Sequence, residues 1–299
     1  TGMHGRYEAT KAQSECDLMI AVGVRFSDRA TGDKREYTKK CTVVHIDIDR
    51  AEIGKNISPD VSMWGDVKEI LSQILEVMPK FEHPEWIAEV EGYRQVSKTL
   101  EFQGFNPRTI IEEVNKHCAP ETVVATDVGQ HQMWTMQYFK FETPHTLLSS
   151  GGLGTMGYGL GAAIGGCFAC GKKRTVLFTG DGSFGMNLNE MATAVKQNLP
   201  LTIILINNDV LGMVRQWQTI FYDSKYSQTI LERKTDYPLL AKAFGADGYC
   251  ATTIEELQAA LDAADQAEGT VLIECRIGRD ERVLPMIPAG RSIKDVILN

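Results

Sequence analysis

The 299-residue chain is long enough for one large domain or two ordinary ones, each with a sizeable core. Hydrophobic residues make up 43% of the chain and charged residues 23%, a balance that excludes a disordered protein. The formal net charge is −8 and no Lys/Arg cluster forms a basic face, so we expect no nucleic-acid partner.

The longest segment without charged residues runs over 143–171, but nine of the 23 positions over 149–171 are glycine. We therefore expect a buried glycine-rich loop and helix here, and no membrane span. Seven scattered cysteines and the lack of a secretory signal indicate reduced thiols in a cytoplasmic protein. Cys167 and Cys170 form a CxxC pair, for which a redox or zinc role is the alternative to core packing.

In chain order, the first elements are short apolar strands followed by a helix. The opening residues predict neither a strand nor a helix. We expect strands over 17–22, 42–48 and 60–64, and an amphipathic helix that Asp66 caps. Residues 79–107 are rich in charge and aromatic side chains, and they predict a connecting segment with one surface helix near 85–100.

Strands and helices then alternate, which predicts an α/β fold with a doubly wound parallel sheet. The expected strands are 122–126, 146–149, 174–179, 201–206, 247–251 and 270–276. The expected helices are 108–117, a small-residue helix ending near 170, 187–197, an amphipathic helix around Trp217, 237–243 and 254–266. The segment over 127–131 is expected as a loop.

Two polar residues directly follow two consecutive strands of this sheet. Asp181 lies in a Gly-Asp-Gly-Ser segment after one strand, and Asn208 follows the next strand 27 positions later. This separation accommodates a right-handed crossover, which returns the second strand parallel to the first. If the strands lie close together, a carboxylate and an amide oxygen meet at one edge, where they suit Mg²⁺ completed by phosphate and water. The alternative to a metal site is that Gly180-Asp181-Gly182 forms only a tight turn and Asn207-Asn208 only a loop.

The segments Gly180-Asp181-Gly182 and Asn207-Asn208 resemble the signature of thiamine-diphosphate enzymes. Further segments resemble acetohydroxyacid synthases, also called acetolactate synthases: 128–134, 150–157, 212–218, 283–286, 2–5, 23–26 and 45–49. In that family, a pyrimidine-binding domain and a central FAD-binding domain precede a diphosphate-binding domain. The resemblance assigns 1–80 to the C-terminal half of the Rossmann-like central domain, 81–104 to a linker, 105–280 to the diphosphate-binding domain and 281–299 to a C-terminal tail.

The resemblance implies decarboxylation of pyruvate and condensation with a second 2-keto acid, pyruvate or 2-ketobutyrate, in valine, leucine and isoleucine biosynthesis. The implied Mg²⁺ ligands are Asp181, Asn208 and the carbonyl of Val210. The implied thiamine-diphosphate contacts are Gly129, Gln130, His131, Gly154, Met156, Gly180, Gly182, Ser183 and Met213. Met156 would hold the cofactor bent, and Met213 and Trp217 would line the pocket of the second keto acid.

The resemblance also implies a structural FAD, of which this chain carries half of the site. The implied flavin contacts are Gly2, Met3, His4, Gly5, Gly23, Val24, Arg25, Phe26, Ser27, Asp47, Ile48, Asp66 and Val67. In the family, the glutamate that activates the cofactor belongs to the pyrimidine-binding domain, and no glutamate here can be given that role. We therefore expect this chain alone to be inactive, and a homo-oligomer with a possible small regulatory subunit in the complete enzyme.

Three alternatives compete with this interpretation. Gly152-x-Gly154-x-x-Gly157 fits the fingerprint of an NAD-dependent dehydrogenase, although Asp181 lies beyond the strand end where that fold needs its acid. The motifs are also compatible with another thiamine-diphosphate decarboxylase or oxidase, or with an inert cofactor-binding module. One departure from the family is Gly161, where proline is usual; glycine should loosen this helix start slightly.

Overall fold

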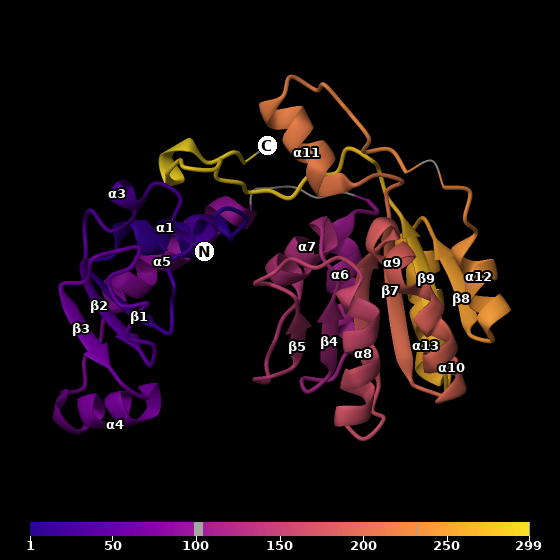
Figure 1. Ribbon diagram of the computed structural model, residues 1–299, viewed down its shortest axis with the longest axis horizontal. Helices are drawn as coiled ribbons and strands as arrows, with labels where there is room; N and C mark the ends of the chain where they lie inside the picture. Colours follow the sequence, from indigo (N-terminus) through magenta and orange to yellow (C-terminus); the bar gives the residue numbers. More distant parts are fainter. Residues whose placement is uncertain (99–103, 232, 299) are drawn as a thin grey trace. The chain divides into compact units, whose positions relative to one another are not determined.

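The computed structural model describes residues 1–98, 104–231 and 233–298. The chain forms two compact units, one of residues 1–101 with 284–299 and one of residues 102–283 (Figure 1). Part of the predicted linker over 81–104, residues 99–103, lies outside the described residues. None of the described helices combines the length and the apolar character that crossing a membrane requires.

The first unit contains a three-stranded parallel sheet in the order β1-β2-β3. Its strands are β1 (Leu18–Val22), β2 (Thr42–Asp47) and β3 (Val61–Trp64). Its helices are α1 (Tyr7–Glu15), α2 (Asp28–Thr31), α3 (Lys34–Tyr37), α4 (Val67–Val77), α5 (Pro84–Lys98) and the 3₁₀ turn η2 (Ile293–Asp295). A small core of Ala21, Phe26, Val43 and Ile57 packs beside the sheet.

The three strands, the helix capped by Asp66 and the surface helix are confirmed. The Asp66 carboxylate accepts hydrogen bonds from the N–H groups of Lys68 and Glu69, which fixes the start of α4. The expectation that no helix opens the chain is wrong, because α1 forms from good helix formers and packs against α5. The weak apolar periodicity of α1 gives no signal in the sequence.

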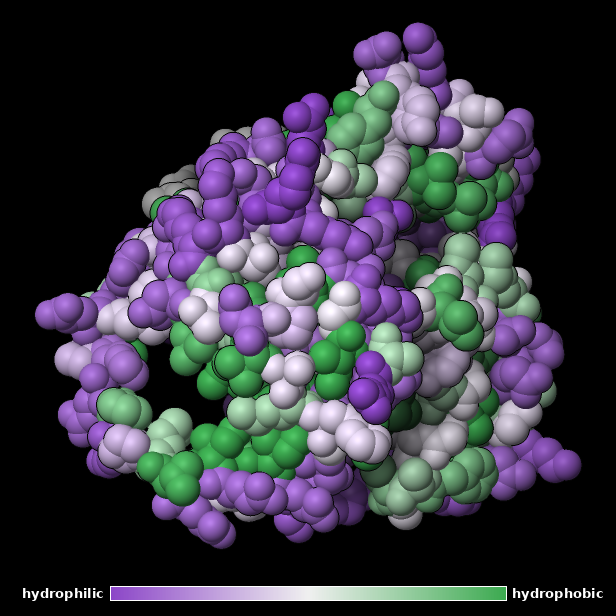
Figure 2. Space-filling view, turned by 60° about the vertical axis from the view of Figure 1, so that its left-hand side comes forward, coloured by the Kyte–Doolittle hydropathy of each residue, from purple (hydrophilic) through white to green (hydrophobic). Residues whose placement is uncertain are grey.

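Much apolar surface of the first unit is exposed. Figure 2 shows apolar side chains, in green, gathered beside hydrophilic ones. The exposed apolar side chains of this unit include Leu18, Ile20, Val22, Ile48, Val61, Trp64, Leu75 and Val77. Residues 284–299, treated above as part of a tail, pack with this unit: the Ile287 N–H donates to the Met3 carbonyl at 2.8 Å.

The second unit contains a six-stranded parallel sheet in the order β5-β4-β6-β7-β9-β8, which confirms the doubly wound fold. Its strands are β4 (Val123–Thr126), β5 (Leu147–Ser149), β6 (Thr175–Gly180), β7 (Leu201–Asn207), β8 (Asp247–Ala251) and β9 (Val271–Arg276). Its helices are α6 (Pro107–Lys116), α7 (Gln130–Tyr138), α8 (Tyr158–Ala169), α9 (Asp181–Asn187), η1 (Leu188–Glu190), α10 (Met191–Lys196), α11 (Gly212–Phe221), α12 (Tyr237–Phe244) and α13 (Ile254–Gln266).

Helices cover both faces of this sheet. Helices α6, α7 and α13 pack on one face, where Ile110, Trp134 and Leu257 meet the strands. Helices α8, α9, α10 and α12 pack on the other, with Leu160 and Phe184 among the buried side chains. Strands β6 and β7 are buried along their whole length, because helices cover both faces of the sheet.

Two helices begin earlier than expected. The expectation of a loop over 127–131 is wrong at its end, because α7 begins at Gln130. The helix expected from 187 is preceded by α9, which begins at Asp181, so the Gly-Asp-Gly-Ser segment is a helix start and not a turn. A larger residue has little room at Gly182, where a Cβ atom would lie 3.0 Å from the Leu211 side chain.

Strands β4 and β6 are neighbours, while β5 lies beyond β4 and β7 lies beyond β6. The connections therefore leave this pair of strands in opposite directions. Such a topological switch point opens a crevice at the carboxyl ends of the strands, where doubly wound sheets bind ligands.

Candidate functional site

A cavity of about 100 Å³ lies at the carboxyl ends of β4, β6 and β7. It is lined by Val128, Gly129, Gln130, His131, Trp134, Met156, Gly180, Asp181, Gly182, Ser183, Ile206, Asn208, Val210, Leu211, Gly212, Met213 and Val214. Because β6 pairs directly with β7, the residues that follow the two strands meet at one edge, as the spacing of Asp181 and Asn208 requires.

Asp181 is the first residue of α9 and its side chain is 3% exposed. Burial raises the pKa of its carboxyl group to about 7, since little water remains to stabilise the charge. Its Oδ2 atom has no hydrogen-bond partner among the described residues. A buried carboxylate oxygen without a partner is costly, and a divalent cation would satisfy it. The residues present therefore fit a metal ion.

Asn208 is held in a network of amide side chains. Its Nδ2 donates to Gln130 Oε1 at 3.3 Å, and its Oδ1 accepts from the Val210 N–H at 3.2 Å. Gln130 Nε2 in turn donates to Gln216 Oε1 at 2.9 Å and to the Glu281 carbonyl at 2.8 Å. These bonds fix the orientation of the Asn208 amide, whose oxygen keeps a second lone pair for a ligand.

His131 lies among glycines that make room for its ring. A Cβ atom at Gly129 would be 2.9 Å from Cε1 of the ring, and one at Gly180 would be 2.9 Å from Nδ1. Burial lowers the pKa of His131 to about 3, so the imidazole is neutral at pH 7. Its Nε2 has no hydrogen-bond partner within the described chain. The cavity thus offers the Nε2 atom of a neutral imidazole, which can donate a hydrogen bond to a phosphate oxygen when that nitrogen carries the proton.

Asp127, directly after β4, is a site residue that the sequence analysis missed. Its carboxylate accepts from the backbone N–H groups of Val128 at 2.9 Å, Gly157 at 2.8 Å and Gly159 at 3.3 Å. It therefore anchors the glycine-rich segment and the start of α8 beside the cavity. The sequence does contain a signal for Asp127, because it directly follows the buried strand β4 just as Asp181 directly follows β6.

The remaining predicted residues of the cofactor site and the substrate pocket divide into two groups. Met156, Gly182, Ser183 and Met213 line the cavity, and the Ser183 hydroxyl donates to the Val128 carbonyl at 2.8 Å. Gly154 and Trp217 do not line it. Trp217 packs edge-on against Phe221 of the same helix, with ring centroids 5.2 Å apart.

The predicted flavin residues lie within the first unit. Most of them follow the ends of its three strands: Gly23, Val24, Arg25, Phe26 and Ser27 after β1, Asp47 and Ile48 at the end of β2, and Asp66 and Val67 after β3. At Gly23 the space where a side chain would project is open, and the φ of +61° favours glycine. The structure therefore brings these motifs to the carboxyl edge of one sheet.

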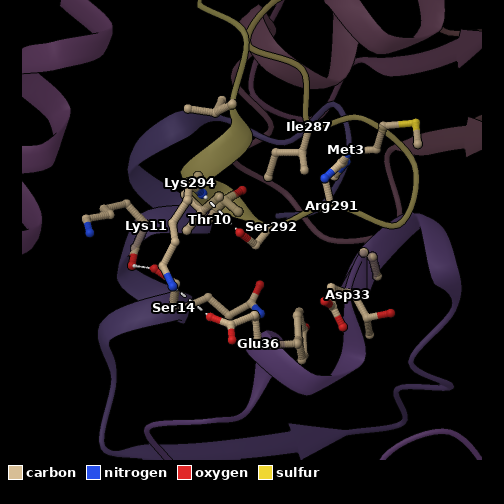
Figure 3. A pocket seen from close by; sticks show the side chains of 18 of the residues that line it. Met3, Thr10, Lys11, Ser14, Asp33, Glu36, Ile287, Arg291, Ser292 and Lys294 are labelled. Carbon is tan, nitrogen blue, oxygen red and sulfur yellow. Dashed lines mark hydrogen bonds and ion pairs between the residues drawn. The ribbon is translucent and has the colours of Figure 1, made fainter.

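The loop over Gly2, Met3, His4 and Gly5 lies beside α2, and the Met3 N–H donates to the Arg29 carbonyl at 2.8 Å. Gly2 and Met3 line a second cavity, of about 640 Å³, whose walls come from α1, α3 and residues 287–296 (Figure 3). An ion pair between Lys294 and Glu36 spans it at 2.8 Å. The other predicted flavin residues do not line this cavity.

Two family models match the chain. Residues 127–275 match the C-terminal TPP binding domain of thiamine pyrophosphate enzymes, and residues 1–74 match the central domain of the same enzymes. These matches favour a thiamine-diphosphate enzyme over the NAD-dependent dehydrogenase considered above.

Curated relatives match nearly the whole chain. It is 42% identical to the acetolactate synthase large subunit of Pyropia yezoensis, over 99% of this chain and 52% of the relative. It is 37% identical to the acetolactate synthase isozyme 2 large subunit of Escherichia coli (strain K12), over 99% and 54%. With the large subunit of Corynebacterium glutamicum it shares 39% identity, over 99% and 49%. The chain thus spans about half the length of these relatives. Its matching regions and its fold confirm the predicted resemblance: the chain belongs to the thiamine pyrophosphate enzymes and is similar to acetolactate synthase large subunits.

Proposed function

We propose that the cavity at the ends of β4, β6 and β7 holds the diphosphate of thiamine diphosphate and its Mg²⁺ in an acetolactate-forming enzyme. The observation that carries the proposal is Asp181, whose buried Oδ2 has no partner within the described chain. It lies at the switch point of the sheet, where doubly wound folds bind ligands, and it lines the same cavity as Asn208.

Each residue has a role in this proposal. Asp181, Asn208 and the carbonyl of Val210 hold Mg²⁺, while Gly129, Gln130, His131, Gly180, Gly182 and Ser183 surround the diphosphate, with Gly154 nearby. Met156 and Met213 provide apolar contact for the rest of the cofactor. When bound, thiamine diphosphate supplies the electron sink for decarboxylation of a 2-keto acid. The chain's own residues bind the cofactor, orient it and exclude water from its charged end.

We further propose pyruvate as the substrate, and pyruvate or 2-ketobutyrate as the acceptor. Trp217 lies four positions after Met213 on α11, so the two side chains project from the same face of the helix. Because Met213 lines the cavity, this shared face supports Trp217 as a residue of the acceptor pocket.

FAD, oligomerisation and location are also part of the proposal. The predicted flavin motifs that follow the three strands of the first unit support a structural flavin at that edge of the sheet. The name 'large subunit' that the relatives carry supports a smaller second subunit as a partner, for which we propose a regulatory role beside a homo-oligomer of the large subunit. All seven cysteines are free thiols, which supports the cytoplasm as its location.

Calorimetric titration of the chain with thiamine diphosphate and Mg²⁺ tests the central proposal. Replacing a direct ligand should cost at least as much as losing a supporting one, so Asp181→Asn should weaken binding by about 100-fold or more. Asp247→Asn, at the exposed start of the edge strand β8, makes the same chemical change away from the cavity and should bind normally. Equal affinities of the wild type and Asp181→Asn would refute the assignment.

A further inference from the structure

Residues 229–231, which follow α11, pair with the loop after β7 that carries two of the proposed Mg²⁺ ligands, Asn208 and Val210. The Leu211 N–H donates to the Thr229 carbonyl at 2.8 Å, and the Leu231 N–H donates to the Asp209 carbonyl at 3.1 Å. Between these bonds, Val210 and Ile230 form an antiparallel bridge. Residues 229–231 therefore fix the backbone on either side of Val210, one of the proposed Mg²⁺ ligands, and next to Asn208.

Further along the chain, Arg233 contacts α9, the helix that begins at the third proposed Mg²⁺ ligand, Asp181. Arg233 Nη1 donates to the backbone carbonyl of Asp181 at 2.7 Å. Its guanidinium lies against α9 at Gly185, where a Cβ atom would be only 2.1 Å from Nη1. Because α9 has no side chain at that point, the arginine can reach the carbonyl of Asp181 at the start of the helix.

The far end of the segment is also fixed to α9. Tyr237, the first residue of α12, is 2% exposed and packs edge-on against Phe184 of α9, with ring centroids 6.1 Å apart. The segment thus contacts the loop after β7 through its backbone and α9 through both Arg233 and Tyr237.

From this arrangement we infer that Arg233 is a positioning residue, which fixes the carbonyl of Asp181 and thereby holds the Asp181 carboxylate in register with Asn208 and Val210. The inference rests on the proposed function, since it assigns the arginine to the Mg²⁺–diphosphate site. Arg233 acts through Asp181 and not by contact with the substrate.

The test compares wild-type protein, Arg233→Met, Arg233→Lys and Lys234→Met, the last removing the neighbouring exposed cation. Calorimetry with thiamine diphosphate and Mg²⁺ should show affinity lowered about 10–100-fold in Arg233→Met, the usual effect of removing a residue that orients a metal ligand. Arg233→Lys, which keeps a cationic donor, should recover part of the loss. Lys234→Met should bind as wild type does.

A second measurement separates positioning from a general loss of folding. With Mn²⁺ in place of Mg²⁺, the electron paramagnetic resonance spectrum of the bound ion should change in Arg233→Met but not in Lys234→Met, because misplaced ligands alter the coordination. Equal affinity and an unchanged spectrum in Arg233→Met would overturn the inference and leave the proposed function intact. Failure of the wild type to bind thiamine diphosphate would instead refute the proposed function.

Discussion

Asp181 and His131 are both buried in one small cavity, and burial shifts their pKa values in opposite directions, to about 7 and about 3. In each case the neutral form is favoured, because the cavity excludes the water that would stabilise a charge. The pH dependence of stability should therefore contain two opposing contributions from two residues that line the same cavity.

The sign of each contribution follows from the protons bound. Between pH 6.5 and about 3 the unfolded chain protonates His131 while the folded chain does not, so this residue lowers stability as the pH falls. Between pH 3.8 and about 7 the folded chain keeps the Asp181 proton that the unfolded chain has released. Asp181 therefore lowers stability as the pH rises through that range.

Replacing His131 with phenylalanine should remove the first contribution. We expect the difference in unfolding free energy between the wild type and His131→Phe to shift in favour of the variant as the pH falls from 6.5 toward 3. Urea unfolding over a pH series measures it. His145→Asn is the matched control, since His145 is exposed and its φ of 62° suits asparagine. A pH-independent difference would contradict the burial argument.

The proposed role of Trp217 in the acceptor pocket is inferred from its position in α11. In an acetolactate-forming enzyme that carries this chain, Trp217→Leu should reduce the preference for 2-ketobutyrate over pyruvate as acceptor. Because apolar ring contacts are lost, this preference should fall by about 10–200-fold. Competition between the two acceptors gives the product ratio directly, and an unchanged ratio would remove Trp217 from the acceptor pocket.

At the scale of elements, the glycines of α8 differ in what surrounds them. Gly161 and Gly165 face open space, so alanine there should stabilise the helix by about 0.5–1 kcal/mol each. A Cβ atom at Gly159 would lie 2.9 Å from the Asp127 backbone nitrogen, so Gly159→Ala should destabilise the second unit. Thermal unfolding measures all three variants. Stabilisation by Gly159→Ala would show that the close approach to Asp127 is not required.

Elements with strong periodicity could be predicted from the sequence, and those defined by tertiary contact could not. The apolar runs of β6 and β7 and the placement of Asp181 and Asn208 after them predicted the edge where the site lies. The helix α9 could not be predicted, because glycine disfavours helices and only the neighbours at Gly182 and Gly185 explain its presence there. The contact of Arg233 with Asp181 joins residues 52 positions apart and has no local signal.

At the scale of the whole molecule, two units with separate cores carry different parts of the proposed function. The cavity of the second unit measures about 100 Å³, enough for the charged end of thiamine diphosphate but not for the whole cofactor. Among the described residues that line it, Asp181 is the one acid, and no glutamate is present. The chain should therefore bind the cofactor's diphosphate without activating the cofactor.

We accordingly expect the chain by itself to bind thiamine diphosphate and Mg²⁺ but to make no acetolactate from pyruvate. The assay uses the purified chain with pyruvate, Mg²⁺, thiamine diphosphate and FAD, with an active acetolactate synthase as the positive control. Turnover in the ordinary enzyme range, about 1–10³ per second, would show that the residues described here suffice for activation.

The most direct test of the central claim is to locate the metal. Crystals of the chain grown with thiamine diphosphate and Mn²⁺, which substitutes for Mg²⁺, give an anomalous difference map that identifies the ion. The account predicts one strong peak about 2.1 Å from the Asp181 carboxylate and the Asn208 amide oxygen, with the diphosphate beside His131. A fully occupied cofactor with the metal elsewhere, out of contact with Asp181, would contradict it.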